Sequence, residues 1–215
     1  MPVIDLATTP LRELNSALHN IQKGSNDLSY EVANPRGSHA VAVGVSGPVL
    51  VDVNGSVGYY CAGMNDGGTI TVHGSVVIEG DASQYAGATG RGGLLVIKGN
   101  AASRCGISMK GIDIVVHGNI GHMSAFMGQS GHLVVLGDAG DALGDSLYEA
   151  KLFVRGTVKS LGADCIEKEM RPEYLQKLAE LLEKAGVKDV RPEEFKRYGS
   201  ARKLYNFNID NADAY

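Results

Sequence analysis

The six histidines of this 215-residue chain are the side chains best suited to bind a transition metal. Two of them, His73 and His117, each stand directly before a glycine at the end of a short apolar segment. A zinc site requires several ligands close together, but Glu79 and Lys98 hold the same position in the segments between these histidines. We therefore interpret this row as facing solvent or a partner, and we expect no metal site on the chain.

The cysteines are candidate nucleophiles. Cys61 lies in YYCAGM and Cys105 in SRCGI, but a nucleophilic cysteine needs a histidine base nearby, and the sequence supplies none visibly. We interpret both as buried thiols. With Cys165 they make an odd number without a close pairing motif, which favours reduced thiols in a cytoplasm.

The segment GATGRGG, residues 87–93, superficially resembles a phosphate-binding loop. Such a loop lies between a strand and the N-terminus of a helix, whereas this one is followed by LLVIKG, another strand-like segment. We therefore predict a corner of a repeating coil. Arg91 is a lone charge in that corner, and we consider it a possible partner contact.

Paired carboxylates could support glycoside hydrolysis, as in carbohydrate-active β-helix enzymes. The candidates fall mostly at turns, where aspartate is common: Asp66, Asp81, Asp138, Asp141 and Asp145. The N-terminal MPVIDLATTP lacks a charged region followed by an apolar one, so we expect no secretion signal. This argues against a polysaccharide substrate, and we expect no catalytic residue on the chain.

The C-terminal stretch RYGSARKLYNFNIDNADAY is basic and aromatic. RNA binding is one interpretation, but the net charge of −4 gives no general electrostatic case for nucleic acid. We favour docking onto another subunit, through Tyr198, Arg202 and Tyr205. There is no apolar run of about 18 residues, so we expect no membrane span.

A glycine that recurs every nineteen residues organises the chain that carries these candidates. The period is broken once, by a six-residue step, and the glycines are Gly55, Gly74, Gly80, Gly99, Gly118, Gly137 and Gly156. A fixed period of this size is typical of a stacked repeat architecture. We expect these glycines to be corner residues that adopt backbone angles other residues resist.

Two rows of aliphatic residues precede each glycine. Two positions before it stand Val53, Val72, Ile78, Ile97, Val116, Val135 and Val154, and four positions before it stand Val51, Ile70, Val76, Leu95, Ile114, Leu133 and Leu152. Side chains two apart on a strand share a face, so both rows should form continuous ladders toward an interior. The residue after each glycine is small and polar, which indicates a turn.

These patterns predict an all-β fold, a single-stranded right-handed parallel β-helix with about 19 residues per coil. Six or so coils at roughly 4.8 Å each make a rod on the order of 30 Å long. Neither the hairpin turns of an antiparallel sandwich nor a leucine-rich pattern fits the constant period. The open strand edges at both ends require caps.

The ends of the chain have a different character. Residues 9–24 read as a helix with Thr9 as N-cap and Gly24 as stop, and residues 25–48 as a connection with one weak coil near 39–44. Pro172 should open a second helix that runs to about Ala185, followed by a short helix at Pro192. We divide the chain into an N-terminal helical segment (1–29), a β-helix (30–165), and C-terminal helices with a docking tail (166–215).

The coils resemble the GXGXG domain at the C-terminal end of the large subunit of glutamate synthase. The resemblance rests on GSVGYYCAGMNDGGTITVHGSV, GDASQYAGATGRGGLLVIKGNA and GDAGDALGDSLYEAKLFVRGTV and covers about residues 30–165. A related module occurs in formylmethanofuran dehydrogenase. A free-standing chain with this helical tail is most similar to the β-helix subunit of N-methylglutamate synthase, also called methylamine–glutamate N-methyltransferase.

The resemblance implies function by assembly. It implies a hetero-oligomer in which a non-catalytic β-helix subunit spaces an amidotransferase-like subunit from an FMN-dependent, glutamate-synthase-like subunit, and supports ammonia transfer. FMN and an iron–sulfur cluster would belong to the partner, and none of the family's catalytic residues lies on the β-helix. The alternatives are a subunit of formylmethanofuran dehydrogenase or of glutamate synthase proper, and a carbohydrate-active β-helix enzyme.

Overall fold

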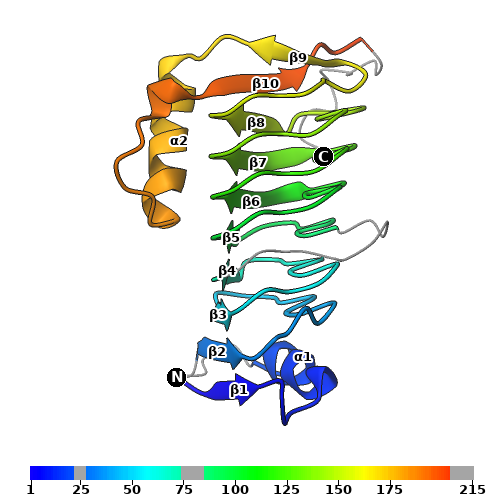
Figure 1. Cartoon of the computed structure of the whole chain (residues 1–215), viewed down its shortest axis with the longest axis vertical. Coiled ribbons are helices and arrows are strands. Elements are labelled where there is room, and N and C mark those ends of the chain that lie inside the picture. The colour runs from blue at the N-terminus through cyan, green and yellow to red at the C-terminus, as the bar shows by residue number, and fades with distance from the viewer. Residues whose placement is uncertain (22–27, 74–84, 204–215) are drawn as a thin grey trace.

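The computed structural model describes residues 1–21, 28–73 and 85–203, and within these ranges the chain forms one long stack of strands (Figure 1). The sheet has the order β1-β2-β3-β4-β5-β6-β7-β8-β10-β9, and its first eight strands are parallel. The strands are β1 (Val3–Asp5), β2 (Ser29–Ala33), β3 (Leu50–Asn54), β4 (Thr69–Val72), β5 (Leu94–Ile97), β6 (Lys110–Val116), β7 (Ser130–Val135), β8 (Lys151–Val154), β9 (Cys165–Lys168) and β10 (Lys196–Ser200). The predicted parallel solenoid is therefore confirmed.

From β3 to β8 the register between successive coils, which we call rungs, follows the glycine period with one exception. The rung before these is also irregular, because Ser29 of β2 pairs with Leu50 of β3, twenty-one residues on. Val51 pairs with Ile70, and Ile114 pairs with Leu133, each nineteen residues on. Ile70, however, pairs directly with Leu95, so this rung spans twenty-five residues. The prediction that a rung ending at Gly80 separates these two strands was therefore wrong, because the six extra residues belong to the longer rung. Gly74, Gly80 and the segment SVVIEG themselves lie outside the described residues.

The two aliphatic ladders fill the interior, as predicted. Their described members are at most 1% exposed: Val51, Val53, Ile70, Val72, Leu95, Ile97, Ile114, Val116, Leu133, Val135, Leu152 and Val154. They share one core with the helix at the N-terminal end and with buried residues of the corners. Each ladder position packs against its neighbours above and below, so the interior contributes stability all along the stack.

At the corner after Gly99, Gly118, Gly137 and Gly156, polar side chains form a ladder of their own. The Oδ1 atom of Asn100 accepts the backbone N–H of Asn119 at 2.7 Å, and the same bond joins Asn119 to Asp138 and Asp138 to Thr157. A Cβ atom at Gly137 would collide with Asn119 Oδ1 and lie 2.8 Å from the carbonyl oxygen of Gly118.

The prediction that the corner glycines adopt backbone angles other residues resist was wrong for most of those described. Of the described ones, only Gly55 has the expected positive φ, of +136°. At Gly118, Gly137 and Gly156 the constraint is close approach, because the preceding rung occupies the space that a side chain would need.

On the opposite edge of the stack, left-handed residues alternate along each rung. Three residues spaced two apart have positive φ, for example Met123, Ala125 and Met127 at +53°, +58° and +52°. The N–H of Ala125 donates to Cys105 in the preceding rung, whereas the N–H groups of Met123 and Met127 donate to Asp141 and Asp145 in the next. Alternating N–H directions bond each rung to both neighbours, which offsets the cost of left-handed backbone at residues other than glycine.

The N-terminal end of the stack is closed by helix α1 (Leu11–His19), which buries Leu14 and Leu18. The helix begins after Pro10 and ends before the predicted Gly24, which lies outside the described residues. The first complete rung begins at β2, close to residue 30, where the β-helix was predicted to start, and not at the weak coil predicted near 39–44. Asn34, with φ of +52°, follows β2 where Gly55 follows β3, so the repeat is present without its glycine.

The C-terminal end is closed by a strand that runs in the opposite direction. After β9 the chain forms α2 (Pro172–Lys184) and the 3₁₀ turn η1 (Pro192–Glu194), and returns as β10. β10 lies between β8 and β9 and is antiparallel to both. The predicted helices at Pro172 and Pro192 are confirmed, and Gly186 follows α2 with φ of +66°.

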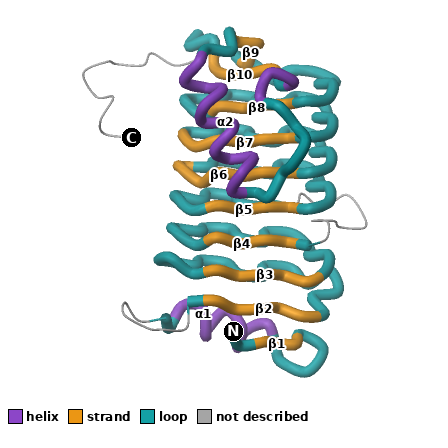
Figure 2. Tube along the Cα trace, turned by 90° about the vertical axis from the view of Figure 1, so that its left-hand side faces the viewer, coloured by secondary structure: helices purple, strands orange, loops and turns teal. Residues whose placement is uncertain are grey.

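Helix α2 covers the outer face of the sheet from β5 to β8 (Figure 2). Leu178, Leu181 and Leu182 pack on a buried outer row formed by Val96, Val115, Val134 and Phe153. In β3 and β4 the corresponding residues are Asp52 and Thr71, which α2 does not cover. The sequence therefore encodes where the cover begins.

Replacing Val116 by aspartate should unfold the stack. The side chain is 0% exposed in an aliphatic ladder, so an unpaired carboxylate there costs several kcal/mol. Chemical denaturation followed by circular dichroism measures the loss. Thr71→Asp, which places the same charge on the uncovered outer face, is the control, and a Val116→Asp variant as stable as this control would contradict the ladder.

Gly137→Ala should destabilise the fold by about 1–3 kcal/mol, because the added methyl group meets the backbone of the preceding rung. Gly92→Ala is the matched control, since its Cβ would have no neighbour nearer than 3.6 Å. Equal melting temperatures for the two variants would show that close approach does not select glycine at the corner.

Candidate functional site

The histidines predicted to face solvent or a partner lie in a row that the chain partly covers itself. His73 lies 3.3 Å from the Asp52 carboxylate and remains exposed. His117 lies 3.2 Å from Lys98 Nζ, and both contact the carbonyl of Ala185 at the end of α2. Among the described residues no group of three or more His, Cys, Asp or Glu side chains could hold a metal ion.

Polar contacts fasten α2 and η1 along this same side of the stack. Lys98 places its charge at the C-terminal end of α2, where the helix dipole favours a cation. Lys177 lies 3.3 Å from Asp113, and Arg155 lies 2.9 Å from Glu194. The residue before each glycine was predicted to face solvent or a partner. At Lys98, His117 and Arg155 this residue instead contacts α2 or η1 of the same chain.

Cys61 and Cys105 are buried, as predicted, and Cys165 is buried as well. Burial raises the pKa of Cys61 and of Cys105 to about 12, and with nearby carboxylates it does the same for Cys165. A thiolate is the nucleophilic form, so none of these groups is poised for attack.

Two of the candidate aspartates, Asp138 and Asp141, bond to the next rung. Asp138 accepts hydrogen bonds from the backbone and hydroxyl of Thr157, which lower its pKa. Asp141 forms an ion pair of 2.7 Å with Lys159. These contacts stabilise turns, as predicted for aspartates at corners. Asp81 lies outside the described residues.

The glycine-rich segment 87–93 is a coil corner, as predicted. The backbone N–H of Arg91 donates to the carbonyl of Asn65 at 2.8 Å, and the chain continues directly into β5. Buried Asn65 also donates to Gly68 and Gly92, which holds the corner against the preceding rung. The Arg91 side chain is exposed.

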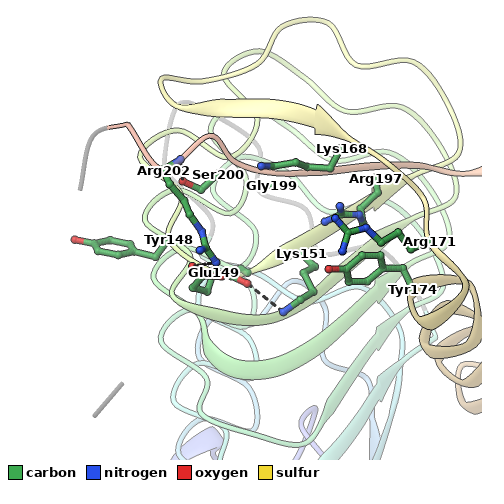
Figure 3. A pocket seen from close by; sticks show the side chains of 11 residues that line it. Tyr148, Glu149, Lys151, Lys168, Arg171, Tyr174, Arg197, Gly199, Ser200 and Arg202 are labelled. Atoms are coloured by element: carbon green, nitrogen blue, oxygen red, sulfur yellow. Dashed lines mark hydrogen bonds and ion pairs between the residues drawn. The ribbon is translucent and has the colours of Figure 1, made fainter. Parts of the chain in front are cut away.

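A basic pocket of about 450 Å³ lies at the C-terminal end of the stack (Figure 3). β8, β9, α2 and β10 contribute to it, and we define it by its charged and aromatic lining residues: Tyr148, Glu149, Lys151, Lys168, Arg171, Tyr174, Arg197 and Arg202. Five of these are cationic and one is acidic, in a chain of net charge −4.

Arg197 is held rigidly at one side of the basic pocket. Its side chain comes from β10, and the central carbon of the guanidinium lies 3.9 Å from the centre of the Tyr174 ring. Its Nε–H donates to the carbonyl of Glu169 at 2.9 Å. Across the pocket, Arg202 and Glu149 form an ion pair of 2.8 Å.

An aromatic groove of about 340 Å³ lies on the left-handed edge of the stack, several rungs away. We define it by Tyr59, Tyr60, Tyr85 and Ile107. The ring centres of Tyr59 and Tyr85 are 6.5 Å apart, and Arg104 Nη1 donates to the Tyr85 hydroxyl at 3.1 Å. Tyr59 and nearby Met64 are 40% and 55% exposed, so apolar surface is available here.

Of the predicted docking residues in the C-terminal stretch, one lies in the basic pocket and none that the structure describes lies in the aromatic groove. Arg202 lines the basic pocket, whereas Tyr198 is 5% exposed within the chain's own core. Tyr198 is therefore removed from the surface that a partner could reach, because β10 is a sheet strand and not part of an extended tail. Tyr205 lies outside the described residues.

The chain is thus a parallel β-solenoid that is closed by α1 at one end and by β10 at the other. Over its whole length the chain is 90% identical to Protein GlxC of Rhizobium meliloti (strain 1021), and the comparison also covers 100% of that protein. The chain belongs to the GlxC family. No protein-family model and no solved structure matches the sequence. Within the described residues, no helix has the length and apolar character needed to cross a bilayer.

The burial of His117 beside Lys98 should make the cap sensitive to acid. Burial and the charge of Lys98 lower the pKa of His117, although the Ala185 carbonyl opposes the shift. The folded chain thus disfavours the proton, so the contribution of His117 to stability is complete above a pH of about 6.5 and falls away as the pH drops below it.

We expect His117→Gln to flatten this pH dependence when unfolding is measured between pH 7 and pH 5. His73→Gln, which alters an exposed histidine of the same row, is the control. An acid response that is the same in both variants would contradict the role of His117.

Proposed function

We propose that this chain is a non-catalytic scaffold subunit of a glutamate-synthase-like flavoenzyme complex of the N-methylglutamate synthase type. The observation that carries the proposal is the parallel stack with nineteen-residue rungs, formed by the segments that resemble the GXGXG domain. In such a complex the chain separates an amidotransferase-like subunit from an FMN-dependent subunit in the cytoplasm. The complex would convert methylamine and glutamate into N-methylglutamate and ammonia.

The physical basis of this role is stiffness. The described rungs are fixed to their neighbours by backbone hydrogen bonds on the strand side and at the left-handed edge. From Asn100 to Thr157 the Asn–Asp ladder adds a further link at the opposite corner. A one-residue slip would turn both core ladders outward. A body of this kind holds two partners at a constant separation, and misplacing reacting groups by about 1 Å can cost on the order of a hundredfold in rate.

Ammonia transfer in this proposal follows the outside of the stack. The interior is filled by two ladders whose described side chains are at most 1% exposed, which leaves it packed with aliphatic groups. A passage between subunits would therefore lie between this chain and a partner. FMN and the iron–sulfur cluster belong to the partner in this proposal.

The aromatic groove is the surface we assign to a partner subunit. Tyrosine is enriched at the energetic centres of protein interfaces because it buries a large ring while its hydroxyl can still form a hydrogen bond. Tyr59, Tyr60 and Tyr85 gather on one edge, and exposed Met64 extends the apolar surface. The groove lies on an edge that α2 leaves open, since α2 packs on the outer face of β5 to β8.

Co-purification tests the proposal directly. The tagged chain, expressed in its native cells, should retain an amidotransferase-like chain and a chain with flavin absorbance, both identified by mass spectrometry. Partners of a molybdenum or tungsten formylmethanofuran dehydrogenase would redirect the assignment to that complex. A colourless, solitary chain, or one that turns over a polysaccharide, would overturn the scaffold role.

The double variant Tyr59→Ser/Tyr85→Ser should weaken this association by at least about thirtyfold, because truncated interface anchors commonly cost 2 kcal/mol or more. Titration of the purified partner against each variant measures the change. Leu50→Ser, which removes a 50% exposed apolar residue on the uncovered sheet face, is the control. Unchanged affinity of the double variant would exclude the groove as the docking surface.

A further inference from the structure

The basic pocket holds positive charge that the described chain does not neutralise. Glu149 pairs with Arg202, and Arg171 pairs with Glu169 and with Glu173. Lys151, Lys168 and Arg197 have no ion-pair partner among the described residues. Three cations without an ion-pair partner in the part of the chain that the structure describes therefore line one hollow.

Arg197 distinguishes the basic pocket from a patch of solvated surface cations, because it is buried and held in place. The residue is only 8% exposed, and both the Tyr174 ring and the Glu169 carbonyl fix its plane. Because Nε is occupied by that carbonyl, the two terminal amino groups retain donors for a ligand. Burying a cation is costly. Glu169 and Glu173 favour the charge of Arg197 from a distance but form no ion pair with it, so a bound anion would reduce the remaining cost.

The other two cations approach from different strands. Lys151 opens β8 and holds its Nζ 3.4 Å from the backbone carbonyl of Glu149, and Lys168 ends β9. Figure 3 shows Lys151, Arg197 and Tyr174 gathered on one side of the hollow and the Arg202–Glu149 pair on the other. The hollow thus combines a strongly cationic wall with aromatic surface.

We propose that this basic pocket binds a small organic anion through a phosphate group, with Arg197, Lys151 and Lys168 as its donors. A phosphate group offers several charged oxygens to converging donors, and arginine binds it with fixed geometry. The volume of about 450 Å³ is within the usual range for a metabolite. The Tyr148 and Tyr174 rings supply contacts for the organic part of such a ligand.

Binding at this place would also stabilise the C-terminal cap. The proposed donors come from β8, β9 and β10, so one ligand would join the last parallel strand to both strands that close the stack. A ligand that binds the folded state alone raises the melting temperature in a concentration-dependent way. This gives the proposal a readout that is independent of any partner subunit and of the scaffold role.

Calorimetric titration of the full chain with pyrophosphate, at low and at high salt, tests the proposal. We expect a Kd below about 1 mM at low salt, accompanied by a rise in melting temperature. Lys151→Gln/Lys168→Gln should weaken binding at least tenfold, and Arg197→Gln more strongly. The double lysine variant keeps the test decisive if Arg197→Gln fails to fold.

Lys159→Gln/Lys188→Gln is the matched control, because it removes two positive charges outside the basic pocket. Absence of binding at millimolar pyrophosphate, or an equal loss in the control, would overturn the proposal. Binding of an acidic peptide without binding of pyrophosphate would also overturn it and would assign the pocket to a protein partner. Inorganic phosphate and succinate, titrated in parallel, distinguish a phosphate site from a general anion site.

Discussion

The register between successive rungs is the constraint on which the rest of the structure depends. It is enforced where the chain turns, because Asn100, Asn119 and Asp138 each accept the backbone N–H nineteen residues further on. The glycines beside them leave space for those side chains. Once this register is set, the alternation of each strand decides which residues enter the core and which row faces α2.

Much of this architecture could be predicted from the sequence because the repeat reports contacts between neighbouring rungs. The buried ladders follow from residues such as Val116 and Leu133, whose types recur at a fixed spacing. The predicted positions of the rungs were wrong where the repeat lacks its glycine or contains an insertion. Asn34 replaces the corner glycine of the first full rung, and the rung between β4 and β5 is six residues longer than the nineteen-residue period.

The outer face was missed although its signal was present. Asp52 and Thr71 give way to Val96, Val115, Val134 and Phe153 at the same strand position, which marks where a cover begins. The two hollows were harder to predict. Tyr60 and Tyr85 are twenty-five residues apart, the span of the long rung between β4 and β5. The basic pocket joins Lys151 to Arg197 only because β10 returns between β8 and β9, and no spacing in the sequence encodes that insertion.

The position of β10 has a consequence for how the chain is made. β9 leaves the ribosome about thirty residues before β10, and it runs in the same direction as β8. During synthesis the free edge of β8 therefore faces a parallel strand that could pair with it directly, in a place that β10 later occupies. Correct closure requires that this edge stay open until the last strand arrives, and a nascent chain stalled before Lys196 would present the edge to other chains.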